Sequence, residues 1–410
     1  MIETKFKNSE VGLIPEDWVA VPLSSIGEVK MCKRILKEQT TESGDVPFYK
    51  IGTFGKEPDA FIPRSLYEQY RSAYPYPKKG TILISAAGTI GRTVVFDGAD
   101  AYFQDSNIVW IDHKEDKVKN SYLEHYFKVI SWKSENGGTI SRLYNDNLRS
   151  TFLCYPKDKD EQSRIATALS DVDELIETLK KLIEKKRNIK QGVMQELLSG
   201  KRRLPGFSDK WVEKKVGIIG NTYNGLSGKT KEDFGVGESQ YITFLNVLNN
   251  PVIDTSIFEQ VNILPNERQN KAIQGDIFFN TSSETPEEVG ICSYLDNEID
   301  NLYLNSFCFG FRITDSEVDG HFLAYFWRSR RGREIMTMLA QGSTRFNLSK
   351  SLFKESSILI PPTKKEQIAI VNVISDMDSE ISMLESRLTK YQSLKQGMMQ
   401  QLLTGKIRLI

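Results

Sequence analysis

The sequence has little cysteine, little histidine and no excess of either charge. Its four cysteines are far apart and form no C-x-x-C pair, so neither a disulfide framework nor a zinc site is indicated. The three histidines, His113, His125 and His321, lack the spacing of metal ligands. The 54 basic residues balance the 54 acidic ones. This argues against a protein that coats nucleic acid by bulk attraction, but it allows local basic surfaces.

Long hydrophobic runs are also missing. No stretch reaches the roughly 18 apolar residues of a membrane span, and the opening MIETKFKNSEVG has no hydrophobic signal region. We therefore expect a cytoplasmic protein with no membrane partner. At 410 residues, 39% of them apolar, the chain can form two or more domains with their own cores.

The familiar catalytic motifs are absent as well. GLSGKT at 225–230 has Tyr223 where a phosphate loop needs its first glycine, and FGVG at 234–237 matches a cofactor loop poorly. The Asn/Asp-Pro-Pro-Tyr/Phe tetrapeptide of amino-methyltransferases is not found around Pro361 and Pro362. We predict a chain that is not an enzyme by itself and that binds no metal and no cofactor.

What the sequence does contain is an internal repeat. Residues 156–204 and 361–409 superimpose without a gap at a shift of 205, and 22 of 49 positions are identical. The shared ending is KQGxMQxLLxGKxRL. Repeats of this kind are the first feature to interpret, because they set the architecture.

Each copy is predicted to be one long helix. Two capping boxes are expected at the start, Asp158 with Glu161 and Thr363 with Glu366. Gly200 and Gly405 supply a left-handed stop. Between these ends, apolar residues step by alternating three and four, which is the coiled-coil pattern. The pattern is interrupted at the same place in both copies, by Lys190 and Lys395. The matched patterns favour pairing of the two helices over two unrelated surface helices.

The segments before the helices share a plan but little identity. Each opens on a tryptophan, Trp18 or Trp211, and continues with a glycine-led strand, alternating strands, an aromatic helical stretch and a small polar turn. The predicted fold class is α+β, with two globular reader domains and two long helices. The predicted boundaries are 1–155 for the first domain, 156–205 for the central helix, 206–360 for the second domain and 361–410 for the C-terminal helix.

The ordered set of motifs resembles the specificity subunits of type I restriction-modification systems over the whole chain. It comprises the paired E-Q…D-x-D…KQGxMQxLLxGKxRL helices, GTILISAAGTIG, and GSTRFNLSKS before IPPTKKEQ. The resemblance implies two target-recognition domains with curved β-sheets, each reading half of a split site in double-stranded DNA. It implies an antiparallel coiled coil that acts as spacer and docks two methyltransferase subunits, with two restriction subunits joining them in host defence. S-adenosylmethionine, ATP and Mg would then be used by the partners.

Antiparallel pairing gives an independent reason for this design. It turns the second unit by about 180° relative to the first, so two different readers address two half-sites at a spacing set by the strut. We expect inserted helical residues to change the gap between the half-sites and to leave the half-sites themselves unchanged.

Candidate DNA-contacting residues are polar side chains in the loops and turns of each reader, since Arg, Asn and Gln read bases and Lys, Ser and Thr hold phosphates. In the first reader the candidates are Lys33, Arg34, Ser85, Thr89, Arg92, Gln104, Asn107, and, in the turn 139–145, Arg142, Tyr144 and Asn145. In the second reader they are Lys229, Lys231, Asn280, Thr281, Ser282, Ser283, Asn305, Arg345 and Asn347.

Other interpretations stay open at this point. Ser-Gly-Thr loops are mostly ordinary turns, and the arginines at 328, 330, 331 and 333 fit a solvated helix face at least as well as phosphate contact. A non-catalytic coiled-coil scaffold that binds proteins is the main alternative function. A recognition subunit for a fused nuclease-methyltransferase partner is another.

Overall fold

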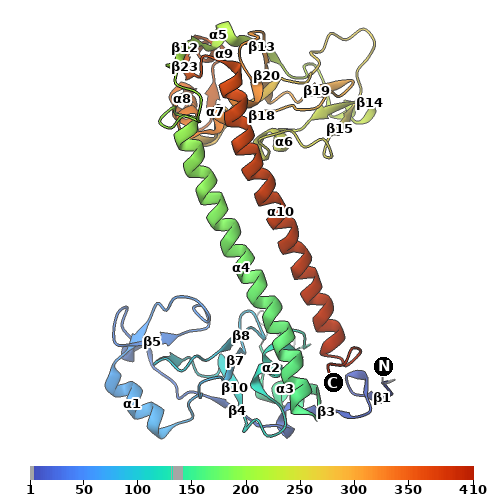
Figure 1. The fold of residues 1–410 in the computed structure, drawn as a ribbon. Helices are drawn as coiled ribbons and strands as arrows, with labels where there is room; N and C mark the ends of the chain where they lie inside the picture. Colours follow the sequence, from blue (N-terminus) through green and yellow to red (C-terminus); the bar gives the residue numbers. More distant parts are fainter. Residues whose placement is uncertain (1–3, 131, 133–141) are drawn as a thin grey trace. The chain divides into compact units, whose positions relative to one another are not determined.

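The structure, a computed structural model, describes residues 4–130, 132 and 142–410. The chain divides into two compact units. The first unit is Met1–Lys180 with Ser386–Ile410, and the second unit is Lys181–Glu385. Both unit borders fall inside the long helices α4 (Lys159–Leu197) and α10 (Lys364–Leu402). Each unit therefore combines one reader with part of both helices (Figure 1).

The first reader is built mainly of short strands. Its elements are β1 (Phe6–Ser9), β2 (Gly12–Pro15), β3 (Trp18–Pro22), β4 (Glu28–Met31), β5 (Val46–Tyr49), β6 (Phe61–Ile62), α1 (Arg64–Ala73), β7 (Ile82–Ser85), β8 (Thr93–Val95), β9 (Tyr102–Phe103), β10 (Ile108–Asp112), α2 (Asn120–Tyr126), α3 (Asn145–Ser150) and β11 (Phe152–Pro156). Short 3-10 turns lie at Leu23–Ser25 and Lys37–Gln39.

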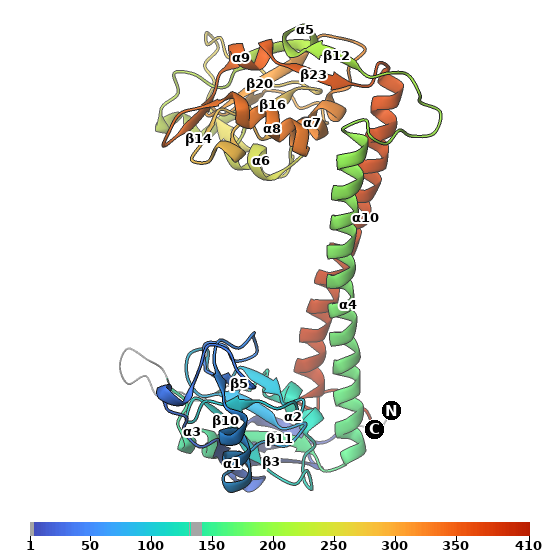
Figure 2. The same ribbon diagram turned by 90° about the vertical axis from the view of Figure 1, so that its left-hand side faces the viewer.

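An antiparallel sheet of four strands, in the order β4-β10-β7-β8, forms the centre of the first reader. A second sheet has the order β6-β5-β9, and its β5–β9 pair is parallel. Strands β3 and β11 pair with each other and lead the chain into α4. Helix α2 lies beside α4 (Figure 2). Lys119, just before α2, donates a hydrogen bond to Ser163 of α4, and His125 of α2 is hydrogen-bonded to Ser170 of α4.

The central strands are buried on both faces, because their side chains alternate between two cores. Ile84 and Val109 face a core that includes Ile165 and Leu169 of α4. Leu83, Ile108 and Trp110 face a second core beside α1. The strands therefore read as nearly continuous apolar runs.

The second reader repeats this plan. Its elements are β12 (Val212–Lys215), α5 (Val216–Ile219), β13 (Gly220–Asn224), β14 (Phe234–Ile242), α6 (Phe244–Asn249), β15 (Glu259–Val261), β16 (Ile277–Asn280), β17 (Ser282–Ser283), β18 (Cys292–Tyr294), β19 (Leu302–Leu304), β20 (Cys308–Ile313), α7 (Gly320–Arg328), α8 (Arg330–Leu339), β21 (Ala340–Gln341), β22 (Phe346–Leu348), α9 (Lys350–Glu355) and β23 (Ser357–Ile360).

The sheet orders of the second reader correspond strand by strand to those of the first. The four-stranded sheet runs β13-β20-β16-β18, the three-stranded sheet runs β15-β14-β19 with a parallel β14–β19 pair, and β12 pairs with β23. A further small sheet, β17-β22-β21, belongs to the second reader. The predicted duplication of the readers thus extends to the strand topology, although their sequences have diverged.

Within each unit the portions of α4 and α10 pack antiparallel as a coiled coil. In the first unit Asp173 pairs with Lys395, and in the second unit Lys186 pairs with Glu380. The predicted apolar seam is buried or half-buried from Ile165 to Leu197 and from Ile370 to Leu402. The predicted α+β class and paired helices are confirmed.

The capping boxes were half wrong. Asp158 accepts a hydrogen bond from the Asp160 N–H (2.9 Å), and the Thr363 hydroxyl accepts one from the Glu366 N–H (3.4 Å). The carboxylates of Glu161 and Glu366, however, bind arginines instead of returning to the cap. A buried carboxylate gains more from a two-pronged guanidinium contact than from one backbone N–H.

Candidate nucleic-acid interface

An open hollow of about 1150 Å³ lies on the first reader beside the end of β9. It is called the first hollow below. Four of the predicted residues line it: Arg34, Gln104, Asn107 and Arg142. They come from three separate segments of the chain, which the fold brings to one surface.

The connector from β9 to β10, residues 104–107, lines the first hollow. Its left-handed residue Ser106 (φ 60°) turns the backbone so that the carbonyl accepts a hydrogen bond from the Arg142 guanidinium (3.1 Å). The Gln104 side-chain carbonyl accepts from the Ile51 N–H (2.9 Å). Both contacts hold the connector in place with little freedom.

Two of these four predicted residues keep groups that are available to a ligand. Arg34 donates to Asp105 (2.9 Å) but keeps 67% of its side chain exposed. Asn107 is half-buried, and within the described part of the chain its side-chain amide has no hydrogen-bond partner. Arginine and asparagine offer the donor and acceptor pairs that match guanine and adenine in the major groove.

A second hollow of about 470 Å³ occupies the corresponding place on the second reader. It is bordered by the segment after β13, by β14 and by the β19–β20 connector, residues 305–307. The predicted residues Lys229, Lys231 and Asn305 line it.

Two of these three side chains are already engaged. The Lys229 ammonium donates to Glu267 (2.7 Å), and only 4% of its side chain is exposed. Asn305 donates to the Ile242 carbonyl (3.0 Å) and accepts from the Phe307 N–H (2.9 Å). These two residues shape the hollow, and Lys231 remains exposed at its edge.

The candidates Ser85, Thr89 and Arg92 lie in one loop, which is held mainly by its own contacts. The buried Ser85 hydroxyl donates to the Thr89 carbonyl (2.5 Å) and accepts from the Arg92 N–H (2.8 Å). The Arg92 guanidinium donates to the Ile51 carbonyl (3.2 Å) and stacks over Phe54. Thr89 alone of the three candidates here is exposed.

The corresponding loop of the second reader is divided in the same way. Asn280 is buried and donates to the Glu288 carbonyl (2.9 Å), while Ser283 donates to the Glu288 carboxylate (2.9 Å). Thr281 is half-buried and Ser282 accepts from Arg345 (3.2 Å).

The remaining candidates lie at the surface of their readers. Arg345, just before β22, and Asn347, within β22, are exposed, and Lys33 lies over the Tyr74 ring. Tyr144 keeps 52% of its side chain exposed at the start of α3, whose first residue is the half-buried Asn145. The part of the predicted turn at 139–141 lies outside the described residues.

The four arginines near α8 separate into two kinds. Arg328 donates to four backbone carbonyls, and Arg333 to two. Burial lowers the pKa of both guanidinium groups. Arg330 and Arg331 are exposed. Two of the four are therefore structural residues rather than parts of a solvated face.

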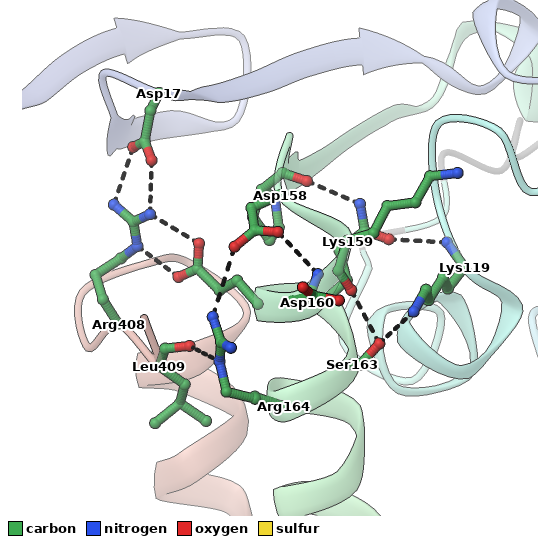
Figure 3. Close-up of polar contacts among 12 residues, drawn as sticks. Asp17, Lys119, Asp158, Lys159, Asp160, Ser163, Arg164, Arg408 and Leu409 are labelled. Atoms are coloured by element: carbon green, nitrogen blue, oxygen red, sulfur yellow. Dashed lines mark hydrogen bonds and ion pairs between the residues drawn. The ribbon is translucent and has the colours of Figure 1, made fainter.

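Sequence reasoning missed a junction that occurs in both units. In the first unit Arg408, beyond the end of α10, donates to Glu161 at the start of α4 (2.5 and 2.7 Å) and to Asp17 (2.7 and 2.9 Å). Figure 3 shows the two contacts between Arg408 and Asp17. Its guanidinium also lies over the Trp18 ring. Hydrogen bonds from Arg408 hold the pKa of the Asp17 carboxyl below its usual range.

The second unit repeats this junction with different partners. Arg203, beyond the end of α4, donates to Glu366 at the start of α10 (2.5 and 2.6 Å) and lies over the Trp211 ring. Trp211 itself donates to Glu366 (3.3 Å). The glutamate, the arginine and the tryptophan that occur in both halves thus belong to one contact. The repeat contained the signal, because the glutamate and the arginine are identical in both copies. The capping-box pattern instead predicted that the glutamates bind the starts of their own helices.

The glutamine after each glutamate ties the helix to its reader. Gln162 accepts from the Lys119 N–H (2.8 Å) at the start of α2, and Gln367 accepts from the Asp319 N–H (2.8 Å) at the start of α7. Both amides also donate to the preceding proline carbonyl. The E-Q dipeptide therefore orients the reader on the helix pair.

The lysines that interrupt the seam form a second repeated contact. Lys395 pairs with Asp173 in the first unit, and Lys190 pairs with Asp378 in the second. A side chain of each reader joins them: His125 bonds Ser170 (3.0 Å), and Tyr325 bonds Asp378 (3.0 Å). These two groups are called the polar joints below.

The comparisons with known proteins agree with this architecture. The family model for the type I restriction modification DNA specificity domain matches twice, at residues 15–185 and 208–394. Because these two matches cover most of the chain, the protein belongs to the family of type I restriction-modification DNA specificity proteins.

Individual relatives lie at different distances. A putative type I restriction enzyme specificity subunit of Haemophilus influenzae, S.HindORF215P, is 57% identical over 159 residues, which is 39% of this chain and 41% of that protein. The putative MjaX specificity subunit of Methanocaldococcus jannaschii is 24% identical, over 99% of this chain and 97% of its own length. The strong identity is thus local, and the full-length likeness is weaker.

Solved structures support the fold. The S subunit of the type I system of M. genitalium superimposes with a TM-score of 0.56 at 17% identity, covering 98% of this chain and 99% of that one. A structure from work on assembly and conformational transition of the type I R-M system gives 0.59 at 14% identity, covering 96% and 99%.

The described residues contain no cluster of three or more His, Cys, Asp or Glu side chains that could hold a metal ion. No helix in that part of the chain is long and apolar enough to cross a membrane.

Proposed function

We propose that this chain recognises an asymmetric, two-part site in double-stranded DNA, with one half-site for each reader. The observation that carries the proposal is the pair of hollows. They occupy the same topological place in two domains of one family, yet different side chains line them. A duplicated scaffold with different linings suits the reading of two different sequences.

The long helices would dock two methyltransferase subunits, and through them two restriction subunits. The support is the contrast within the repeat. The helices share 22 of 49 positions, whereas the readers keep little beyond their topology. A common partner on both helices explains the similarity of these surfaces.

Methyl transfer and cleavage would then belong to those partners, which would use S-adenosylmethionine, ATP and Mg. This chain's residues would bind DNA and position it for the transfer. The protein would work in the cytoplasm, where the chromosome and incoming DNA are accessible.

Single-molecule sequencing tests the proposal directly. DNA from cells that express this chain with its cognate methyltransferase should carry modified adenine in both halves of a split motif. A continuous motif, or no modification beside an active methyltransferase, would contradict it. Fluorescence polarisation compares the affinity of the purified complex for motif and scrambled duplexes. A DNA-reading subunit binds the motif more tightly, whereas a protein-binding scaffold shows no preference for either duplex.

A further inference from the structure

The two hollows present opposite chemistry at one equivalent position. The carbonyl of Asn107 accepts a hydrogen bond from the Ala86 N–H (2.8 Å), and the carbonyl of Phe307 accepts one from the Thr281 N–H (3.0 Å). Each of these residues immediately precedes the central strand of its four-stranded sheet, β10 or β20. The first reader therefore places an amide where the second places a phenyl ring.

Phe307 is one of two large apolar side chains exposed at the second hollow. Its exposed fraction is 61%, and that of Leu245, the second residue of α6, is 62%. The half-buried rings of Phe234, Tyr241 and Phe244 continue the surface between them. Apolar groups that gather at an exposed hollow mark a contact site more often than single exposed residues do.

Polar groups in the second hollow have little capacity left for reading bases. Asn305 and Lys229 are engaged as described above. The Thr243 hydroxyl caps α6 by accepting from the Asn246 N–H (3.2 Å). The Tyr241 hydroxyl donates to Glu259 (2.5 Å), and burial together with this carboxylate raises the pKa of Tyr241 to about 12.

The geometry points to recognition of A·T pairs by the second reader through the 5-methyl groups of thymine, with Phe307 and Leu245 as the contacting side chains. The thymine methyl is the one apolar group that a base pair presents in the major groove. The exposed Lys231 at the edge of the hollow is suited to a phosphate. This inference rests on the proposed function and names the chemistry of one half-site.

The first reader supplies the contrast within the same molecule. Its first hollow holds an exposed Arg34 and the amide of Asn107, which has no hydrogen-bond partner among the described residues; both groups suit hydrogen bonds to purine edges. Removing the methyl groups of thymine should therefore affect one half-site and spare the other.

The test uses the complex of this chain with its methyltransferase and duplexes of its own motif. Deoxyuridine, which lacks the 5-methyl group, replaces thymine first in one half-site and then in the other. Because a buried methyl group contributes about 0.8 kcal/mol, we expect roughly fourfold weaker binding for each contacted methyl, in one half-site only. Phe307→Ala should weaken binding to the thymine duplex and reduce the difference between thymine and deoxyuridine.

Met338→Ala is the matched control, because Met338 is 77% exposed on α8 and is not among the residues that line the second hollow. It should leave both affinities unchanged. The inference is overturned if deoxyuridine binds as well as thymine in both half-sites, or if Phe307→Ala has no effect. In each of these cases specific binding to the split motif persists, whereas failure of the proposed function removes that binding itself.

Discussion

Single arginines hold the beginnings of the long helices. Arg408 and Arg203 lie beyond the ends of α10 and α4, and each binds a glutamate whose side chain is at most 1% exposed. A buried carboxylate that loses its partner is costly, whereas an apolar pair in its place is often tolerated. Removing either arginine alone should therefore be costly, because its glutamate is then left buried without a partner.

Arg408→Ala should destabilise the start of α4 by about 3 to 5 kcal/mol, because Glu161 is left buried and unpaired. Hydrogen exchange should show lost protection at residues near 161 and unchanged protection near 366. Arg203→Ala is the matched control and should give the reverse pattern. Equal loss at both helix starts would contradict the assignment of one arginine to one junction.

His125 gives the first unit a response to acid. Burial lowers the pKa of its imidazole, and the nearby Lys128 and Lys395 lower it further, while Glu124 and Asp173 act in the opposite direction. The folded unit therefore binds this proton less readily than the unfolded chain does. Stability is present in full above the ordinary histidine value of about 6.5 and falls as the pH decreases through it.

Replacing His125 by tyrosine should reduce this acid sensitivity, because Tyr325 occupies the equivalent place in the second unit and bonds the equivalent residues. Thermal unfolding of H125Y and the parent protein at pH 7.5 and 5.5 measures the effect. His321, whose pKa burial also lowers, keeps a contribution in both proteins, so the difference between them is the informative quantity. An identical loss of stability in both would exclude His125 as the cause.

At the level of elements, the polar joints set the register of the helix pair. A charged pair at a seam position is satisfied in one alignment only, and such positions specify register at some cost in stability. Lys395 and Asp173 keep 19% and 33% of their side chains exposed, so their energy is modest. Their main effect is to exclude other registers of the helix pair.

Reversing one charge of a polar joint, as in Lys395→Asp, should destabilise the helix pair by about 1 kcal/mol, because two carboxylates then face each other. The double reversal with Asp173→Lys should restore most of the loss. A double-mutant cycle from urea unfolding gives the coupling energy. A cycle that closes with no coupling would show that the joint does not act as a pair.

For the whole molecule, the length of the helices is proposed to set the gap in the DNA site. Seven residues inserted at Lys181 in α4 and seven at Ser386 in α10 keep the heptad pattern and add about 10 Å. At 3.4 Å per base pair the gap should grow by about three base pairs. Methylation mapping should show the same half-sites; altered half-sites with an unchanged gap would contradict the spacer role.

Sequence reasoning succeeded where the signal is local or repeated. Helix periodicity, left-handed Gly200 and Gly405, whose φ values are 71° and 72°, and the succession of strands and helices along each reader all follow from short-range rules. It failed where a residue chooses between a local partner and a distant one. Glu161 and Arg408 are 247 positions apart, and Arg92 turns inward although its loop looks suited to a ligand. Which of the two partners such a side chain binds can be seen only in the folded chain.

Arg408 and Arg203 each follow one long helix and bind the start of the other, and this arrangement has a genetic consequence. The residues that complete the first unit are translated after the whole of the second unit, so a stop codon just after Gly405 removes the contacts of Arg408 with Asp17 and Glu161. Such an allele would damage the first reader and leave the second unit intact. A truncation beyond α10 should therefore impair recognition of the half-site proposed for the first reader.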